Sequence, residues 1–318
     1  MRSFLVAFIL ITTLQAGAQT HAISNGQTSA QKVVIVTGVR FSYKLVQKWI
    51  DEYNKINPEI QIVIESRGSS DPGNYDVLAE VYEHHESLKQ TREYIYVGRY
   101  AVLPVAVFGS EFASVYEKKG LTKKIIQQVY FHNLFADNDE KGNIKAPFTV
   151  YTRMQKAGVP SVFANYFGFE QKDINGKGIA GSDEHLLKAM LRDSTGISYL
   201  PLTLAYDHAT RKPVAGLTVL PVDIDDNGKI NDGEKFFGNL DDVIRRIESA
   251  GGRDVKNIPI EYLHLSVDKD NASAEAVAFL QWINENGQKH LNEFGYLLPE
   301  SSRFDKSTFN DFASKRSY

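Results

Sequence analysis

The spacing of apolar and polar residues predicts alternating strands and helices in the first part of the chain. Residues 32–37 form a mainly apolar run that ends at Gly38, which is typical of a buried strand. Apolar residues then recur at helical spacing over 43–53, with Ser42 as a candidate N-cap. Residues 61–65 repeat the strand pattern, and 76–88 predict a second helix. This order predicts an α/β sheet with ligand loops at the strand ends.

The rest of the chain continues this alternation. A long β-rich stretch at 94–108 suits a segment that crosses from one lobe to another. Further strands are predicted at 196–200, 217–222 and 258–267, and helices are predicted after Pro160 and over 274–287. With 318 residues, the chain is long enough for two domains or one large one.

Two polar turns, more than a hundred residues apart, each precede a predicted helix. The first covers residues 37–42 and the second covers 151–158. A helix N-terminus carries about half a positive charge and free N–H groups, so it can hold an anion. Arg153 lies beside the second helix start and can bind an oxyanion through two parallel hydrogen bonds, although a surface salt bridge is an equal alternative. Arg40 and Arg67 can add to this grip or replace it. The pattern suggests one anion held between two lobes.

Residues 223–234 match the twelve-residue calcium loop at every diagnostic position. The loop has oxygen donors at positions one, three, five and nine, glycine at six, an apolar residue at eight and glutamate at twelve. The alternative is a polar surface turn that binds nothing. Because a strand precedes the loop, we expect a single structural calcium site rather than a paired sensor. The predicted ligands are Asp223, Asp225, Asn227, Lys229, Asn231 and Glu234.

The N-terminal residues and the composition indicate an exported protein. A cationic start, an apolar run over 4–14 and Ala16-Gly17-Ala18 predict a signal peptide over 1–18, cleaved before Gln19. The run is shorter than the roughly 20 residues of a membrane-spanning helix, which is the alternative. The absence of cysteine excludes disulfides and a lipid-modified cysteine. A net charge of −3 argues against a nucleic-acid partner. We expect a periplasmic protein without a lipid anchor.

Catalytic patterns are weak, so we expect no enzyme. Gly68-Ser69-Ser70 lacks the frame of a nucleophile elbow. His84-His85-Glu86 lacks the spacing of a zinc-binding helix. The chain also has no cysteine nucleophile and no phosphate-loop signature.

Several segments resemble PstS-type phosphate-binding proteins, the periplasmic receptors of phosphate ABC importers. They are residues 36–53, 151–163, 176–182, 196–199 and 287–299, so the resemblance extends from about 32 to 300. It implies a type II periplasmic binding protein fold, with two α/β lobes joined by two crossing strands around a ligand cleft. Lobe I is then expected from 19–104 plus 221–318 and lobe II from 105–220. The implied function is capture of phosphate or a related oxyanion by a monomer, for an ABC permease in the membrane.

The resemblance also implies a set of ligand-binding residues and shows where this chain departs from the family. The family's third loop usually reads Arg-x-x-x-Ser-Gly-Thr, whereas Ala157 and Val159 replace its hydroxyl donors here. Each lost donor can cost about 1–3 kcal/mol of binding energy. Asp76 and Glu80 are candidates for the acid that accepts the anion's proton. The implied ligand-binding residues are Val39, Arg40, Phe41, Ser66, Arg67, Ser69, Ser70, Arg153, Ala157, Gly158 and Val159.

Two alternatives remain open from the sequence. A descendant of the same fold that no longer serves transport can bind another ligand, or act as a calcium-stapled partner in a surface or membrane complex. A phosphoester hydrolase has less support, because neither a nucleophile nor a metal cluster is visible near the loops.

Overall fold

The computed structural model describes residues 33–65, 74–81, 90–131, 144, 146–249, 255–300 and 306–315. The chain separates into two units, Met1–Gln31 and Lys32–Tyr318, and every described residue belongs to the second. The predicted signal peptide lies outside the described residues, as do Ser66, Arg67, Ser69 and Ser70. Among the described helices, none combines the length and the apolar character needed to cross a bilayer.

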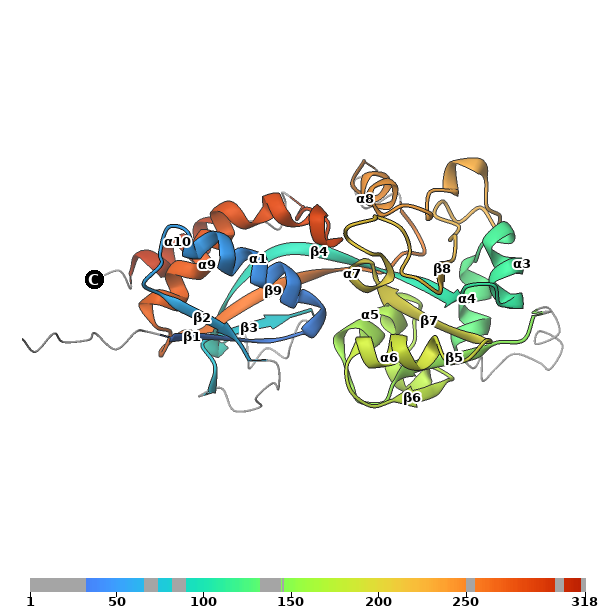
Figure 1. Ribbon diagram of the computed structural model, residues 1–318, viewed down its shortest axis with the longest axis horizontal. Coiled ribbons are helices and arrows are strands. Elements are labelled where there is room, and N and C mark those ends of the chain that lie inside the picture. The colour runs from blue at the N-terminus through green and yellow to red at the C-terminus, as the bar shows by residue number, and fades with distance from the viewer. Residues whose placement is uncertain are drawn as a thin grey trace, which may run out of the picture. The chain divides into compact units, whose positions relative to one another are not determined.

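Nine strands of the described chain form one mixed sheet in the order β2-β1-β3-β9-β4-β7-β5-β6, with β8 paired to β4 (Figure 1). β1 is parallel to β2 and β3, whereas β9 is antiparallel to β3 and β4. β5 is parallel to β6 and β7, and β4 is antiparallel to β7 and β8. The strands are β1 Val33–Gly38, β2 Gln61–Ile64, β3 Val77–Glu80, β4 Arg92–Val107, β5 Thr149–Arg153, β6 Lys177–Ile179, β7 Gly196–Pro201, β8 Leu217–Val219 and β9 Ile260–Asp268.

β4 belongs to both halves of this sheet. Its residues from Arg92 to Ala101 pair with β9, and those from Val102 to Val107 pair with β7 and β8. The β-rich stretch that the sequence predicts at 94–108 is therefore a single strand of 16 residues.

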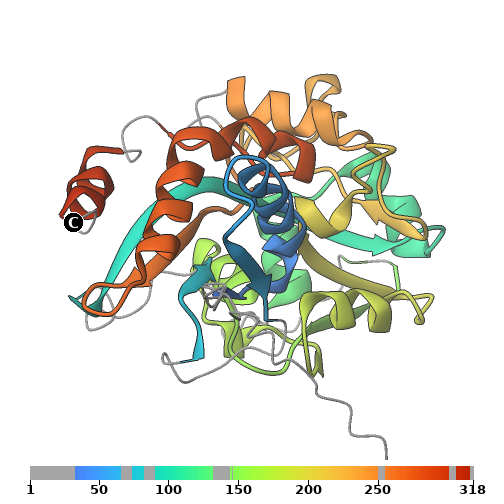
Figure 2. The same cartoon turned by 60° about the vertical axis from the view of Figure 1, so that its left-hand side comes forward.

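The first half of the sheet is covered by α1 (Tyr43–Asn54) and α9 (Ala274–Asn286). The apolar positions predicted from helical spacing in α1 are buried, and Trp49 is fully enclosed. The Trp49 indole N–H donates to the Gly287 carbonyl at 2.9 Å, and the Tyr53 and Phe279 rings lie 5.2 Å apart. Figure 2 shows the two helices side by side. Burying such side chains contributes about 1.5–3 kcal/mol each.

The second half contains an aromatic core under α5. The Phe163 ring stacks on Tyr199 at 4.3 Å, and the Tyr130 hydroxyl donates to the Ser198 carbonyl at 2.6 Å. The remaining α-helices are α3 Glu111–Lys119, α4 Lys123–Tyr130, α5 Gly158–Tyr166, α6 Asp183–Met190, α7 Leu202–Ala205, α8 Leu240–Ser249 and α10 Lys306–Ser314. Short 3-10 helices are η1 Arg40–Ser42, η4 Gln171–Asp173, η5 Asp232–Glu234, η6 Gly287–His290 and η7 Asn292–Phe294.

One local prediction is wrong, and another is confirmed only in part. Residues 77–80 form β3 rather than the start of a helix, because they pair with β1 on one side and β9 on the other. Residues 82–88 lie outside the described part. Ser42 is the N-cap residue of α1, but its side chain forms no capping hydrogen bond, because its hydroxyl donates to the Val39 carbonyl at 2.7 Å.

The segment before β9 contacts elements of the second half of the sheet. The Asp223 N–H donates to the Leu121 carbonyl at 3.0 Å, and the Asn257 N–H donates to the Tyr166 hydroxyl at 2.8 Å. The lobe boundaries at 104/105 and 220/221 stay a prediction.

Candidate functional site

A cavity of about 390 Å³ lies where three helices begin. Its described lining comes from the turn into η1, from the loop between β5 and α5, and from the start of α6. The two polar turns that the sequence predicts as anion loops therefore line one cavity. The described lining residues are Gly38, Val39, Arg40, Phe41, Val81, Arg153, Ala157, Gly158, Val159, Gly181, Ser182, Asp183 and His185.

Two of these helix starts present backbone N–H groups that have no described hydrogen-bond acceptor. They belong to Arg40 and Phe41 in η1, and to Gly158 and Val159 in α5. The first N–H groups of a helix lack partners within it, and the helix dipole adds positive potential at the same place. The Phe41 and Val159 side chains are buried, so these residues face the cavity chiefly through their backbone.

Arg153, at the end of β5, is one of two arginines in the described lining of the cavity; the other, Arg40, is exposed. One guanidinium nitrogen, Nη1, lies 3.1 Å from Oδ1 of Asp183, and both side chains are only about one-seventh exposed, at 14% and 13%. The Arg153 Nε is buried and has no hydrogen-bond partner among the described residues. The guanidinium therefore keeps donor capacity beyond its ion pair.

Asp183 is a site residue that sequence reasoning missed. It is the first residue of α6, where the dipole favours a carboxylate. Burial raises the pKa of the Asp183 carboxyl, and the Arg153 charge works in the opposite direction. Gly181-Ser182-Asp183 is itself a polar turn before a helix, so the signal that marked the other two turns was present here as well.

The two acids proposed from the sequence as proton acceptors lie elsewhere. Asp76 accepts the Ile35 N–H through Oδ2 at 2.8 Å, which is a role within the sheet. Glu80 lines an adjoining cavity, and burial raises the pKa of its carboxyl to about 7, against the opposing charge of Arg92. Neither residue is among the described lining of the cavity at the helix starts.

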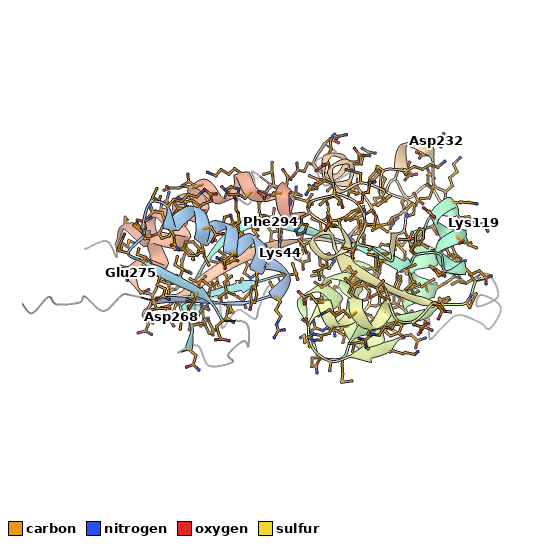
Figure 3. The ribbon with its side chains drawn as sticks, in the orientation of Figure 1. Lys44, Lys119, Asp232, Asp268, Glu275 and Phe294 are labelled. Carbon is orange, nitrogen blue, oxygen red and sulfur yellow. The ribbon has the colours of Figure 1, made fainter. Side chains whose placement is uncertain are left out.

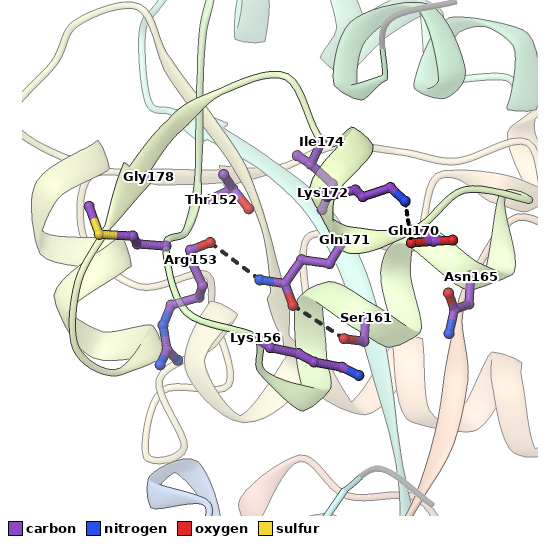
Figure 4. Close-up of a pocket in the computed structure, with 11 residues that line it drawn as sticks. Thr152, Arg153, Lys156, Ser161, Asn165, Glu170, Gln171, Lys172, Ile174 and Gly178 are labelled. Atoms are coloured by element: carbon purple, nitrogen blue, oxygen red, sulfur yellow. Dashed lines mark hydrogen bonds and ion pairs between the residues drawn. The ribbon is translucent and has the colours of Figure 1, made fainter.

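Gln171 holds the loop between β5 and α5 through four hydrogen bonds. Its Oε1 accepts the Ala157 N–H at 3.0 Å and the Ser161 hydroxyl at 3.2 Å. Its Nε2 donates to the carbonyls of Gln155 at 2.9 Å and Arg153 at 3.3 Å. Figure 4 shows the bonds of Gln171 to Ser161 and Arg153. The Ala157 N–H is thus already engaged. Nothing in the sequence pattern pointed to Gln171.

Two further cavities adjoin this loop. One, also of about 390 Å³, shares five lining residues with the first cavity, namely Gly38, Val39, Val81, Ala157 and Gly158. The other, of about 600 Å³, includes Arg153 and the Lys172–Glu170 ion pair of 2.9 Å (Figure 4). Its described lining includes none of the unpaired backbone N–H groups, so we take the cavity at the helix starts as the candidate site.

The loop predicted to bind calcium brings three acidic side chains together. Oxygens of Asp223, Asp225 and Glu234 all lie within 4.8 Å of one another, and these residues could hold a metal ion. Asp223 and Glu234 are buried, whereas Asp225 is exposed. Burial raises the pKa of the Asp223 carboxyl, although N–H groups of Gly228 and Asn227 oppose this.

The other predicted ligands are partly engaged within the loop. The Asn227 side-chain oxygen accepts the Lys229 N–H at 3.1 Å, and the Asn231 oxygen accepts the Gly233 N–H at 2.9 Å. Asp232 points outward to Lys235, at 2.7 Å; Figure 3 labels it.

The loop is fastened to the second half of the sheet at two places. The Asn257 side chain donates to the Asp223 carbonyl at 2.7 Å, while its backbone N–H donates to Tyr166 at the end of α5. Ile230 packs closely on Gly120, because a Cβ atom added to Gly120 would lie 1.8 Å from the Ile230 side chain. Through Asn257 the loop is thus linked to the C-terminal end of α5, the helix whose N-terminus faces the candidate site.

Comparisons with solved structures show the fold. The chain is similar to a phosphate ABC transporter substrate-binding protein with bound phosphate from Clostridium perfringens, at 13% identity and a TM-score of 0.63, over 84% of this chain and 100% of that one. It is similar to an ABC-type phosphate transport receptor from Vibrio cholerae at 13% identity and a TM-score of 0.56, with the same coverage. It is also similar to the BenM effector-binding domain with benzoate, at 12% identity and a TM-score of 0.50, over 85% and 97%.

No protein-family model and no curated protein matches the sequence. The fold expected from the sequence is confirmed by structure alone. The chain is an α/β protein with a mixed sheet, of the fold that type II periplasmic binding proteins share with LysR effector-binding domains.

Proposed function

We propose that this chain is an exported solute-binding protein that captures phosphate or a related oxyanion between two lobes. The observation that carries the proposal is that the turn before η1 and the loop before α5 line the same cavity. Unpaired backbone N–H groups and Arg153 supply the donors that an oxyanion needs. Residues 66–70 complete the site in this proposal.

In this proposal, Arg153 and Asp183 together make the site prefer an oxyanion that carries a proton. The anion's oxygens accept from the guanidinium and the backbone, while a protonated oxygen on the anion donates to the Asp183 carboxylate. An oxyanion without a proton would meet that carboxylate as a like charge. We therefore propose Asp183, rather than Asp76 or Glu80, as the acid that accepts the anion's proton.

Transport follows from the same proposal. Two structural neighbours are phosphate-transport receptors by name, which supports an ABC permease as the membrane partner and the periplasm as the location. A monomer with lobe I from 19–104 plus 221–318 and lobe II from 105–220 would deliver the anion to that permease.

Titration calorimetry of ligand-stripped protein with phosphate, arsenate and sulfate tests the proposal. We expect binding of phosphate or arsenate, and weaker binding of sulfate, which carries no proton at neutral pH. Arg153→Ala removes charge-assisted hydrogen bonds of about 1.5–3 kcal/mol, so affinity should fall at least tenfold. Arg245→Ala is the control, because Arg245 only pairs with Asp242 on the exposed face of α8. If no oxyanion binds, the proposed function is wrong.

A second candidate is a binding protein of the same fold without a transport role. The similarity to an effector-binding domain with benzoate favours it, as do Ala157 and Val159 at positions where the transport family carries hydroxyls. Such a protein would bind another ligand or join a surface complex. Recovery of the mature chain from the periplasmic fraction, cleaved before Gln19, would favour the transport receptor over a cytosolic regulator.

We propose calcium as the ion of the acidic loop. Asp223 and Glu234 are both buried, and no described cationic side chain forms an ion pair with either. Bringing unpaired charges out of water costs several kcal/mol, which a divalent cation would offset. Oxygen ligands at the spacing of this loop suit calcium, and the bound ion would hold the loop in one conformation.

A further inference from the structure

We infer that the ligand of the candidate site is an organic oxyanion, whose mainly apolar body occupies the adjoining cavity beside β3. This inference rests on the proposed function, because it names the ligand class of the same site. The headgroup lies at the helix starts, and the body extends along the wall formed by Leu78 and Val81.

The two cavities adjoin each other. Five residues line both, and each cavity measures about 390 Å³. A four-oxygen ion displaces the volume of a few water molecules, each about 30 Å³. Cavities of about 300–1,000 Å³ are the size that holds organic small molecules. A bare inorganic ion would therefore leave most of this space filled with water.

The shared wall suits carbon better than oxygen. The side chains that line both cavities are those of Val39, Val81 and Ala157. Ala157 offers a methyl group where a hydroxyl would donate, and Gln171 already holds the Ala157 N–H. Leu78 extends the apolar wall in the adjoining cavity, and its side chain is partly exposed there. Arg153 thus belongs to the described lining of the first cavity and not of the second, whereas the second cavity adds the apolar side chain of Leu78 together with Glu80 and Lys156.

The charged residues of the adjoining cavity are few. Among its described lining residues, only Glu80 and Lys156 carry ionisable side chains, and the pKa of Glu80 is raised by burial. A second anionic group on the ligand would meet Glu80 as a like charge whenever that carboxyl is ionised. The body is thus expected to be mainly apolar, with no second anionic group facing Glu80.

Calorimetry with matched pairs of probes tests this inference. The first pair is inorganic phosphate and phenyl phosphate, and the second is acetate and benzoate, so that the two headgroup chemistries are distinguished. For at least one headgroup we expect the aromatic member to bind at least tenfold more tightly than the bare ion. Arg153→Ala should weaken both members of that pair.

Variants of Leu78 test whether the apolar body of the ligand lies in the adjoining cavity. Leu78→Ser should reduce the preference for the aromatic member at least threefold and leave the affinity for the bare ion unchanged; Leu78→Ala is the milder second variant. Val63→Ser is the control, because Val63 is a partly exposed strand residue outside the described lining of both cavities.

The outcomes separate this inference from the proposed function. Equal affinity for bare and aromatic ions would overturn the inference and leave the oxyanion site standing. An aromatic preference that survives both Leu78 variants would also overturn it, because the body would then lie elsewhere, such as in the larger cavity beside Lys172. Failure of every probe to bind would overturn the proposed function itself.

Discussion

At the scale of single residues, Gly38 has a backbone conformation that favours glycine, and it also lines the candidate site. Its φ is +131°, and an added Cβ would lie 2.0 Å from the Ala79 carbonyl oxygen in the neighbouring strand. Backbone atoms of a paired strand cannot move aside cheaply. Gly38 therefore lets the first turn approach β3 while it lines the cavity.

Gly38→Ala should destabilise the fold more than a strained φ alone would. The strain costs about 1–3 kcal/mol, and the clash adds to it. Gly109→Ala is a matched control, because Gly109 has a φ of +76° but nothing within 4 Å of its added Cβ. Urea unfolding would measure both variants. Equal loss of stability in the two would show that the contact with Ala79 is unimportant.

Glu80 should make stability depend on pH. Burial raises the pKa of its carboxyl from 4.5 to about 7, so the folded protein holds this proton more tightly than the unfolded chain. The contribution is fully present below pH 4.5 and is lost as pH rises through 7, with a total of about 3 kcal/mol. The charge of Arg92 opposes this rise in pKa, and Nε2 of His264 lies 3.8 Å from Oε2 of Glu80.

The measurement is urea unfolding of wild type and Glu80→Gln from pH 4 to pH 8. The wild type should lose stability relative to the variant as pH rises, because the glutamine does not ionise. Glu117→Gln, on the exposed face of α3, is the control. A constant difference between wild type and Glu80→Gln across this range would contradict the expected shift.

At the scale of residues, the sequence predicted which residues lie at the candidate site better than it predicted what each of them contacts. Arg153 was predicted as a donor, but its ion pair with Asp183 depends on bringing β5 and α6 together, which no local pattern encodes. Phe41 and Val159 were predicted from family resemblance, and both line the cavity although their side chains are buried. The hydrogen bonds of Gln171 join residues up to 18 positions away and likewise have no local signal.

At the scale of elements, the loop before α5 is held in shape by η4. Gln171→Met keeps the side-chain volume but removes all four hydrogen bonds to the loop. The loop should become mobile, and oxyanion affinity should fall by about 1–3 kcal/mol, or roughly 5- to 100-fold. Calorimetry would measure this, with thermal unfolding to verify the fold.

Lys172→Met is the matched control for this prediction. Lys172 follows Gln171 in η4 and pairs only with the exposed Glu170. Gln171→Glu should restore part of the affinity, because its oxygens still accept from Ala157 and Ser161. Wild-type affinity in Gln171→Met would exclude a positioning role for this residue.

The acidic loop should make stability depend on calcium. A ligand at a hundred times its Kd stabilises the folded state by about 2.7 kcal/mol, so a chelator should lower the melting temperature by several degrees. Asp223→Ala should abolish that response, because it removes a buried carboxylate of the loop. Asp232→Ala should retain it, because Asp232 is exposed and pairs with Lys235. A chelator-insensitive wild type would leave the loop as an ordinary turn.

Most elements could be predicted because their apolar spacing is regular. The helix α1 buries the five positions that its spacing indicated, and β4 covers nearly the whole predicted β-rich stretch. β3 was missed because it is only four residues long, and its strand state depends on partners from residues 36–38 and 264–267. Short central strands of this kind are determined by pairing more than by local pattern.

At the scale of the whole molecule, the sequence indicated the fold through several weak resemblances in the right order. Solved structures at 12–13% identity confirm that fold, and identity this low leaves the ligand undecided. The ligand depends on side chains at the site, where this chain differs from the phosphate-binding pattern at Ala157 and Val159. Fold is preserved by core burial, whereas specificity depends on a few exposed donors.

The continuity of β4 limits how the candidate site can close. Its hydrogen-bonding partner changes from β9 to β7 between Ala101 and Val102, within one unbroken backbone. We expect the two walls of the cavity to approach each other through twisting of β4 along its length, rather than through sliding of one wall past the other. Ligand capture would then change the twist of β4. Amide hydrogen exchange around Val102, which lies more than 40 residues in sequence from Gly158, would detect this change.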